Sequence, residues 1–280
     1  MDRLGPDRAI PGIDVDGAHK WRPSAPLREH VTDIWAWRSS ATVPGTHQGV
    51  PGGHLTVVLC LDGDMELLRA PDPARSPGRY VSSVAGLHAS PAVIATGPPQ
   101  AGMQLRLTWR GARELLGLPA GELSGDVVDL GLLLPGFGSV LDRVREAPTW
   151  PTRFALLDRE LCRVIDRRDR AGEPAREVVR AWDVLLRTGG TARIDELAGE
   201  VGWSRRHLGE RFRAETGLGT KTAARLIRFE RACDLLRSPA RPGLADVAAV
   251  CGYADQPHLA RDFRDLAGLT ATGWLAERPA

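Results

Sequence analysis

Arginine and glutamine side chains near the C-terminal end of the chain could bind a nucleic acid. Between Ser204 and Arg231 the sequence has eight basic residues against three acidic ones, and nearly all of these bases are arginine. A guanidinium forms paired hydrogen bonds with phosphates or with the edge of guanine, and a glutamine can do so with adenine. A solvated helix surface can be equally rich in arginine, so the elements that position these side chains decide between the two interpretations.

A repeated unit carries these residues. The stretch "ELAGEVGWSRRHLGERFRAETG" returns about fifty positions later as "DVAAVCGYADQPHLARDFRDLAG". Each copy has the apolar spacing of a short helix, then a glycine, then a second helix. Gly202 and Gly252 suit a left-handed residue at the end of the first helix, and Ser204 and Asp255 are the candidate N-caps of the second. Helix, tight turn and helix form the helix-turn-helix arrangement.

The second helix of each unit is expected at about 204–215 and 255–266. A recognition helix presents its leading end and its outer stripe to the major groove. The candidate DNA-binding residues in these places are Ser204, Arg205, Arg206, Gly209, Glu210 and Arg213 in the first unit and Asp255, Gln256, Pro257, Ala260, Arg261 and Arg264 in the second. Gly209 has no side chain to donate, Glu210 would repel phosphate but could accept from a cytosine amino group, and Pro257 is not polar. Base reading is therefore expected mainly from Arg205, Arg206, Gln256 and Arg261.

The segment between the two units, "TKTAARLIRFERACDLLRS", predicts a linker helix. A helix of roughly 18 residues spans about 27 Å. It could hold the two recognition helices on one face of the duplex, about one turn (~34 Å) apart. Arg225 and Arg228 on this helix are expected to contact phosphates, as are Arg213 and Arg264.

Residues 177–275 resemble the C-terminal domain of AraC-type (AraC/XylS) bacterial transcription regulators. The resemblance rests on "IDELAGEVGWSRRHLGERFRAETGLG", "RLIRFERACDLLRS" and "LADVAAVCGYADQPHLARDFRDLAGLT". It implies that both units contact one double-stranded DNA site from one polypeptide. The base-reading positions of that family fall on Arg206, Gly209, Glu210, Gln256, Pro257, Ala260 and Arg261.

The first half of the chain predicts strands followed by helices, which is typical of an α+β domain. "DIWAWRS", "HLTVVLCLDG" and "GMQLRLTW" have the pattern of strands, and "GARELLGL" and "TRFALLDRELCRVIDRR" that of helices. We therefore expect a poorly ordered lead-in (1–24), a strand-rich α+β domain (25–168), a linker (169–176) and an all-α domain with two helix-turn-helix units (177–280).

Residues 25–165 also resemble the sensory domains of some such regulators, through "PGGHLTVVLCLD", "YVSSVAGLH" and "GMQLRLTWRGARELLGLPAGELSGDVVDL". This resemblance implies binding of a small-molecule effector, or formation of a homodimer. RNA polymerase is a further partner that a regulator of this type can have. Trp35, Trp37 and Trp109 are candidate walls of an apolar effector pocket, although buried core tryptophans would give the same pattern.

The sequence offers no catalytic set, so we expect a regulator and not an enzyme. "GLGTKT" (217–222) has threonine at 220 where a phosphate loop needs glycine, and "GFG" (136–138) lacks the third glycine of a dinucleotide fingerprint. His47, His54 and His88 have no metal-ligand spacing and are expected in turns or on the surface. Cys60 stands alone, without the clustered cysteines of a methyl-acceptor repair module. No cofactor and no metal are therefore predicted.

Composition limits the remaining classes of protein. The four cysteines are far apart in the sequence, which favours neither a disulfide framework nor a zinc site. The apolar runs are much shorter than the ~20 residues that cross a bilayer, and the first residues do not form a secretory signal. A cytoplasmic location is expected. The alternative function is a small-molecule-binding protein or enzyme in residues 25–165 that the C-terminal half localises on DNA.

Overall fold

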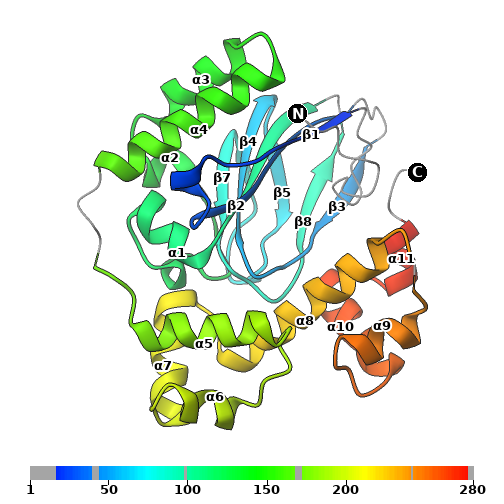
Figure 1. Cartoon of the computed structure of the whole chain (residues 1–280). Helices are drawn as coiled ribbons and strands as arrows, with labels where there is room; N and C mark the ends of the chain where they lie inside the picture. Colours follow the sequence, from blue (N-terminus) through cyan, green and yellow to red (C-terminus); the bar gives the residue numbers. More distant parts are fainter. Residues whose placement is uncertain (1–16, 40–43, 98–99, 168–171, 241, 277–280) are drawn as a thin grey trace.

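Strands occupy the first half of the chain and helices the second (Figure 1). The computed structural model describes residues 17–39, 44–97, 100–167, 172–240 and 242–276. One antiparallel sheet has the strand order β1 (Gly17–Trp21), β2 (Val31–Ser39), β9 (Gln100–Leu107), β4 (Leu55–Asp62), β7 (Ser82–Ala85) and β10 (Val127–Asp129). The other has the order β3 (Gly45–Gly49), β8 (Ala92–Thr96), β5 (Met65–Arg69) and β6 (Gly78–Tyr80). The expected α+β class is confirmed.

The central strands β4 and β9 have two faces with different partners. Val57 and Leu59 of β4, with Leu105 and Leu107 of β9, point into an apolar core shared with helices. The residues between them in sequence point the other way, because successive side chains of a strand alternate in direction. The second face therefore turns toward a different part of the molecule, a cavity described below.

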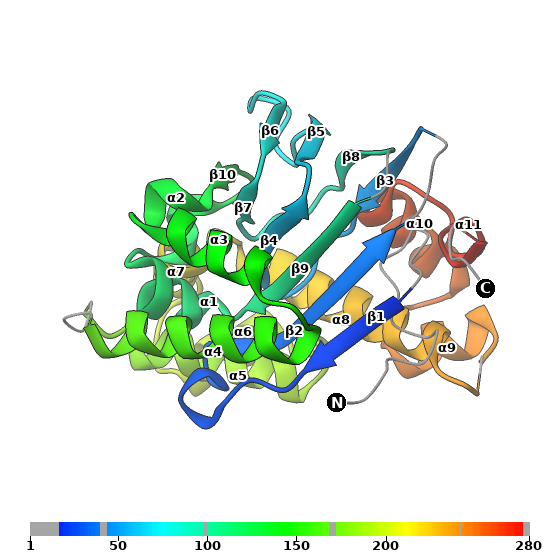
Figure 2. The same ribbon diagram turned by 90° about the horizontal axis from the view of Figure 1, so that it is seen from above.

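Short and long helices cover the apolar face of the larger sheet (Figures 1 and 2). They are the 3-10 turn η2 (Ala25–Leu27), α1 (Trp109–Gly111), the π-helical turn η3 (Ala112–Leu116), the 3-10 turn η4 (Ala120–Leu123), α2 (Leu130–Leu133), α3 (Phe137–Glu146) and α4 (Trp150–Arg167). The helix expected in "TRFALLDRELCRVIDRR" is confirmed as α4, and its Phe154, Leu157 and Leu161 are buried in this core.

The expected lead-in is wrong where the structure describes it. Residues 17–21 form strand β1, which pairs with β2 along its whole length. Its last residue, Trp21, stacks on Phe154 of α4 with ring centroids 5.6 Å apart. This stacking of the half-buried Trp21 ring helps to hold β1 on the edge of the sheet, and the sequence pattern of glycine, histidine and lysine does not reveal it. Residues 1–16 of the lead-in, and 169–171 of the expected linker, lie outside the described residues.

The C-terminal half contains two helix pairs of matching length. The helices are α5 (Arg176–Arg187), α6 (Ile194–Glu200), α7 (Arg205–Thr216), α8 (Thr220–Arg237), α9 (Leu244–Val250), α10 (Gln256–Ala267) and α11 (Ala271–Ala276). The first helix has 7 residues in both pairs (α6 and α9), and the second has 12 (α7 and α10). Gly202 and Gly252 end the first helices with φ of 73° and 75°. The predicted duplication and the 18-residue linker helix α8 are confirmed.

The two halves of the chain share one apolar core. Trp182 of α5 lies between Trp109 of the first half and Phe212 of α7, at ring-centroid distances of 6.1 and 5.7 Å. All three rings are buried, and they belong to one continuous cluster of core residues. The first helix pair is consequently packed on the strand-rich half and is not a separate globule.

We predict that Phe212→Ala destabilises the whole chain. Loss of this buried ring should lower the free energy of unfolding by about 3–5 kcal/mol. Chemical denaturation followed by circular dichroism measures the effect, with Leu132→Ala as the matched control because Leu132 is 78% exposed. If tryptophan fluorescence shows the strand-rich half unaffected by Phe212→Ala while the helices melt early, the shared core is not energetically coupled.

Candidate functional site

The two recognition helices begin at the caps that the sequence predicts. The Ser204 hydroxyl oxygen accepts the backbone N–H of His207 at 3.2 Å, and a carboxylate oxygen of Asp255 accepts that of His258 at 2.7 Å. Both histidine rings then pack edge-on against an aromatic residue, His207 against Trp203, directly before its cap, and His258 against Tyr253, two residues before its cap. The two units therefore share this contact between a histidine and an aromatic ring, which the spacing of apolar residues in the sequence does not predict.

The outer faces of both helices are accessible. The Arg206 side chain is 89% exposed and bonds the Glu210 carboxylate one turn later at 2.9 Å, and Arg205 pairs with Asp195 of α6 at 3.1 Å. On the second helix Gln256, Pro257, Arg261 and Arg264 are exposed, and Ala260 is half-buried. In the first, Arg213 is exposed and Gly209 is half-buried.

Two arginines of the linker helix bond inside the protein instead of pointing freely outward. Arg225 donates to the carboxylates of Asp262 and Asp265, both on α10, at 2.7 and 2.6 Å. Arg228 donates to the carbonyl oxygen of Gly190 at 2.8 Å. Both residues are predicted to contact phosphates, but in the protein Arg225 joins α10 to α8 and Arg228 joins the loop between α5 and α6 to α8.

The C-terminal end of the first recognition helix is attached to the strand-rich half. Arg113 of η3 donates to the Glu215 carboxylate from Nε and Nη2 at 3.0 and 2.8 Å, and the two side chains are only 17% and 7% exposed. The Ser124 hydroxyl donates to the carbonyl of Gly217 at 3.1 Å. A buried, two-bonded ion pair resists separation because removing either partner leaves an unpaired charge. This attachment leaves the leading end of α7 exposed.

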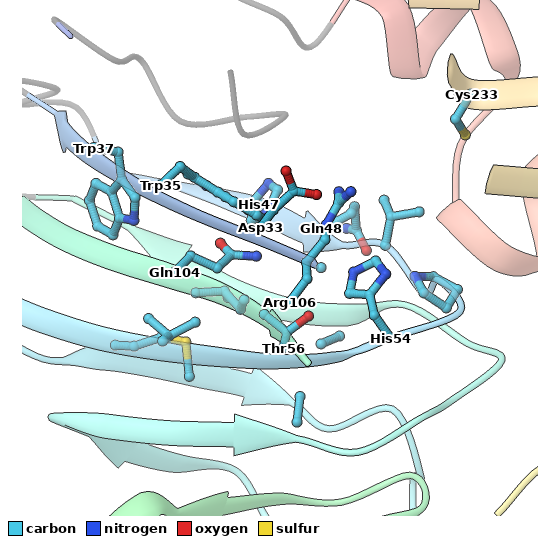
Figure 3. Close-up of a pocket in the computed structure, with 18 of the residues that line it drawn as sticks. Asp33, Trp35, Trp37, His47, Gln48, His54, Thr56, Gln104, Arg106 and Cys233 are labelled. Atoms are coloured by element: carbon cyan, nitrogen blue, oxygen red, sulfur yellow. The ribbon is translucent and has the colours of Figure 1, made fainter. Parts of the chain in front are cut away.

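A cavity of about 630 Å³ lies between the two sheets and is closed on one side by α8. Its lining comes from both sheets, from α8 through Phe229, Glu230 and Cys233, and from Trp274 of α11. Figure 3 shows the floor of the cavity, with side chains of β2, β4 and β9 pointing toward Cys233 across the space. A volume of this order is typical of small-molecule sites.

The floor of the cavity is built from three rows of side chains across β2, β9 and β4. Strand pairing fixes the rows as Asp33–Arg106–Thr56, Trp35–Gln104–Val58 and Trp37–Gly102–Cys60. A Cβ at Gly102 would lie 2.8 Å from the Trp37 ring, so only glycine lets the indole lie across the strand. The first row is charged and the last is apolar. A molecule in the cavity would meet a polar end and an apolar end.

Two of the three tryptophans predicted as pocket walls lie on the cavity, and the third does not. Trp35 and Trp37 line the cavity, on the same face of β2. Trp109 does not, because β9 ends at Leu107 and Trp109 begins helix α1, where it is buried against Trp182. Lys20, His47 and Gln104, none of them a predicted binding residue, join the lining instead.

The three histidines expected in turns or on the surface all line this cavity. Burial lowers the pKa of His47 to about 4. Burial also lowers the pKa of His88 to about 4, although a hydrogen bond between the His88 ring and the Ser90 carbonyl opposes the effect. His54 also has a lowered pKa because of burial and the nearby charge of Arg106. Strand register and loop closure, which short motifs do not encode, bring them to one cavity. Within the described residues, no group of three or more His, Cys, Asp or Glu side chains is placed to hold a metal ion.

Glu230 connects the linker helix to the polar end of the cavity. One of its oxygens lies 3.3 Å from His54 Nδ1 and 3.9 Å from Arg106, and the other accepts the backbone N–H of Gly53 at 3.1 Å. Burial alone would raise the pKa of Glu230, but the hydrogen bond from His54 and the charge of Arg106 hold it well below its usual range. Glu230 therefore stays ionised and ties α8 to the loop before β4.

Comparison with known proteins gives a family match at the C-terminal end. The family model described as "Helix-turn-helix domain" matches residues 197–277. No curated protein sequence is detectably similar to the chain. In the part of the chain that the structure describes, no helix has both the length and the apolar character needed to cross a membrane.

Solved structures of ToxT from Vibrio cholerae have a similar fold. The crystal structure from strain O395 is 11% identical, with 88% of this chain and 97% of that chain covered and a TM-score of 0.52. The unsaturated-fatty-acid-bound protein from strain SCE256 is also 11% identical, with 92% and 98% covered and a TM-score of 0.55. A third ToxT structure, bound to (E)-4-(8-methylnaphthalen-1-yl)but-3-enoic acid, has a TM-score of 0.53 at 11% identity, with 87% and 98% covered. At this identity the likeness concerns the fold.

We predict a pH dependence of stability that comes from the cavity. His47 is 5% exposed with a pKa near 4, whereas in the unfolded chain it takes up a proton near pH 6.5. The unfolded state therefore binds more protons between these pH values, and the native state loses up to about 3 kcal/mol from this residue as pH falls from 6.5 to 4. Because His47→Gln removes the titrating group, its free energy of unfolding should fall less steeply over this range.

The measurement is urea denaturation at half-unit steps between pH 7 and 4.5. His207→Gln is the matched control, because His207 is exposed. Parallel curves for the wild type and His47→Gln would contradict the prediction.

Proposed function

We propose that the chain is a DNA-binding transcription regulator of the AraC type, which reads two successive major-groove segments of one DNA site under the control of a small molecule in its cavity. The observation that supports the DNA part is the pair of capped, exposed recognition helices joined by α8. Both views of the molecule place the helix pairs at opposite ends of α8 (Figures 1 and 2).

Base contacts are proposed for the leading ends and outer stripes of both helices. In the first unit Arg205 and Arg206 are the main donors, and their pairing with Asp195 and Glu210 must give way to bases. Such exposed pairs contribute little to stability, so exchanging them for DNA contacts costs little. Glu210 itself could accept from a cytosine amino group.

The second unit offers Gln256 and Arg261, with Pro257 and Ala260 as apolar neighbours. Pro257 occupies the first turn of α10, where a missing backbone N–H costs no helical hydrogen bond. Phosphate contacts are proposed for Arg213 and Arg264, which are exposed, and for the helix end capped by Ser204, whereas the Asp255 carboxylate caps α10. We propose that Arg225 orients the second unit on α8 through Asp262 and Asp265, that Arg228 holds the segment before the first unit through Gly190, and that both reach phosphates only secondarily.

Control by an effector is proposed from the position of the cavity. The cavity contacts α8 directly, and α8 carries the second helix-turn-helix unit, so an occupant of the cavity touches the element that joins the two units. The fold of ToxT, which has been solved with a fatty acid bound, supports this assignment. We propose binding without turnover. Action in the cytoplasm, contact with RNA polymerase and pairing with a second copy remain predictions.

We predict that Arg206→Ala and Arg261→Ala each weaken binding to the cognate DNA site by about 1–3 kcal/mol and binding to random DNA much less. Each substitution removes donors that can bond base edges. The site is first selected from a random duplex library with the wild-type chain, and binding is then measured by fluorescence anisotropy. Arg159→Ala is the matched control, since Arg159 is an exposed arginine of α4, outside the proposed DNA-binding residues. Equal losses on cognate and random DNA would show that Arg206 and Arg261 contact only phosphates.

A further inference from the structure

Arg106 has a guanidinium group that the protein itself does not saturate. Its face lies over the Trp35 ring at 5.1 Å, and its nearest carboxylate oxygen, on Glu230, is 3.9 Å away, beyond hydrogen-bond distance. The Arg106 Nε atom is buried and has no hydrogen-bond partner. Among the described residues we find no acceptor bonded to the guanidinium, although a third of the side chain is accessible. An arginine with unused donors inside a cavity is suited to an acceptor that arrives with a ligand.

The other basic side chains of the cavity are already engaged. Lys20 forms an ion pair with Asp33, and the Arg237 guanidinium stacks on the Trp274 ring at 4.1 Å. Arg106 comes from the middle strand of the charged row, with Asp33 on one side and Thr56 on the other. The planar fork of a guanidinium matches the two oxygens of a carboxylate, and such paired bonds are stronger than neutral ones. Arg106 is therefore the anchor point for an acidic group.

The lining of the far end of the cavity determines which kind of ligand body fits there. Beyond Arg106 the floor passes from Trp35 to Trp37, whose ring fits over Gly102. The second sheet contributes Met65, Leu67 and Ile94 to the lining. These surfaces are apolar and include two aromatic rings, so they favour a flat or extended hydrocarbon body.

A carboxylate of a ligand would compete with Glu230 for the region beside Arg106. Glu230 is the carboxylate nearest to Arg106, and it is the residue through which α8 reaches His54 and Gly53. A second anion at Arg106 would stand close to Glu230, and two carboxylates at one site repel each other. An acidic ligand must therefore weaken the hold of Glu230 on the polar end of the cavity.

We propose that the cavity binds an organic carboxylic acid with an aromatic or alkyl body, whose carboxylate bonds Arg106 and displaces the Glu230 side chain of α8. The proposal rests on the proposed function, because it names the effector class and the contact through which the effector reaches the linker helix. The signal is the release of α8 from the loop that holds Gly53 and His54.

The test uses two pairs of probes that differ only in charge. 1-Naphthaleneacetic acid is compared with 1-naphthaleneacetamide, and decanoic acid with decanamide, by isothermal titration calorimetry on the full chain at pH 7.5. We expect at least one acid to bind tenfold or more tightly than its amide. Arg106→Gln should abolish that preference while leaving amide binding unchanged. Glu230→Gln should increase affinity for the acid about tenfold, because the competing carboxylate is gone. Glu66→Gln, an exposed acid outside the cavity lining, should change neither affinity.

Three outcomes would overturn the proposal. They are equal binding of acid and amide, an acid preference that survives in Arg106→Gln, and failure of all four probes to bind at 1 mM. Reduced acid affinity in Glu230→Gln would overturn the competition with Glu230. Thermal melting of each variant shows whether it is folded. Sequence-preferring DNA binding, measured on the same preparations, would persist if only the ligand class is wrong and would be absent if the proposed function itself fails.

Discussion

Helix α8 is packed on several sides at once, and both functional features depend on that packing. Its buried residues include Ala224, Leu226, Ile227 and Ala232, which at 3.6 residues per turn point to different sides of the helix. A helix that is apolar on several faces must be surrounded by protein. Here it is surrounded by the first helix pair, the second helix pair and the cavity. The segment that sets the spacing of two DNA-binding helices is therefore also a wall of a small-molecule site.

Charged side chains are exposed on the recognition helices and part-buried around α8. On the recognition helices the arginines are exposed, and their carboxylate partners on the same unit are weakly held. Around α8 the contacts of charged groups are part-buried, as at the ion pair of Arg225 with Asp262 and at the contact of the Glu230 carboxylate with the His54 ring. Removing one partner of a buried pair leaves an unpaired charge, whereas exposed pairs exchange at little cost. The exposed arginines can thus exchange their carboxylate partners for groups of the DNA, while the part-buried contacts around α8 keep the helices in place.

The DNA-binding half was predictable from sequence because its signals are local. Caps at Ser204 and Asp255, glycines at helix ends and apolar pairs such as Leu208 and Phe212 act within a few residues of one another. The cavity could not be predicted from the sequence, because it depends on the register between strands that are distant in the chain. Arg106 faces Asp33 only because β9 pairs with β2, and Glu230 meets His54 across most of the chain. Trp109 continues the alternation of apolar and polar residues of strand β9, and the sequence therefore predicts it on the strand. A capped helix begins at Trp109 instead, and its ring lies in the core.

The most direct test of the account is whether the full chain binds one DNA sequence through charged contacts from both units. Fluorescence anisotropy would be measured with DNA from upstream of its own gene and with a scrambled duplex, from low to high salt. We expect clear preference for one upstream sequence, an affinity that falls steeply as salt rises, and loss of that preference when either half of the site is scrambled. Equal affinity for upstream and scrambled DNA at every salt concentration would contradict it.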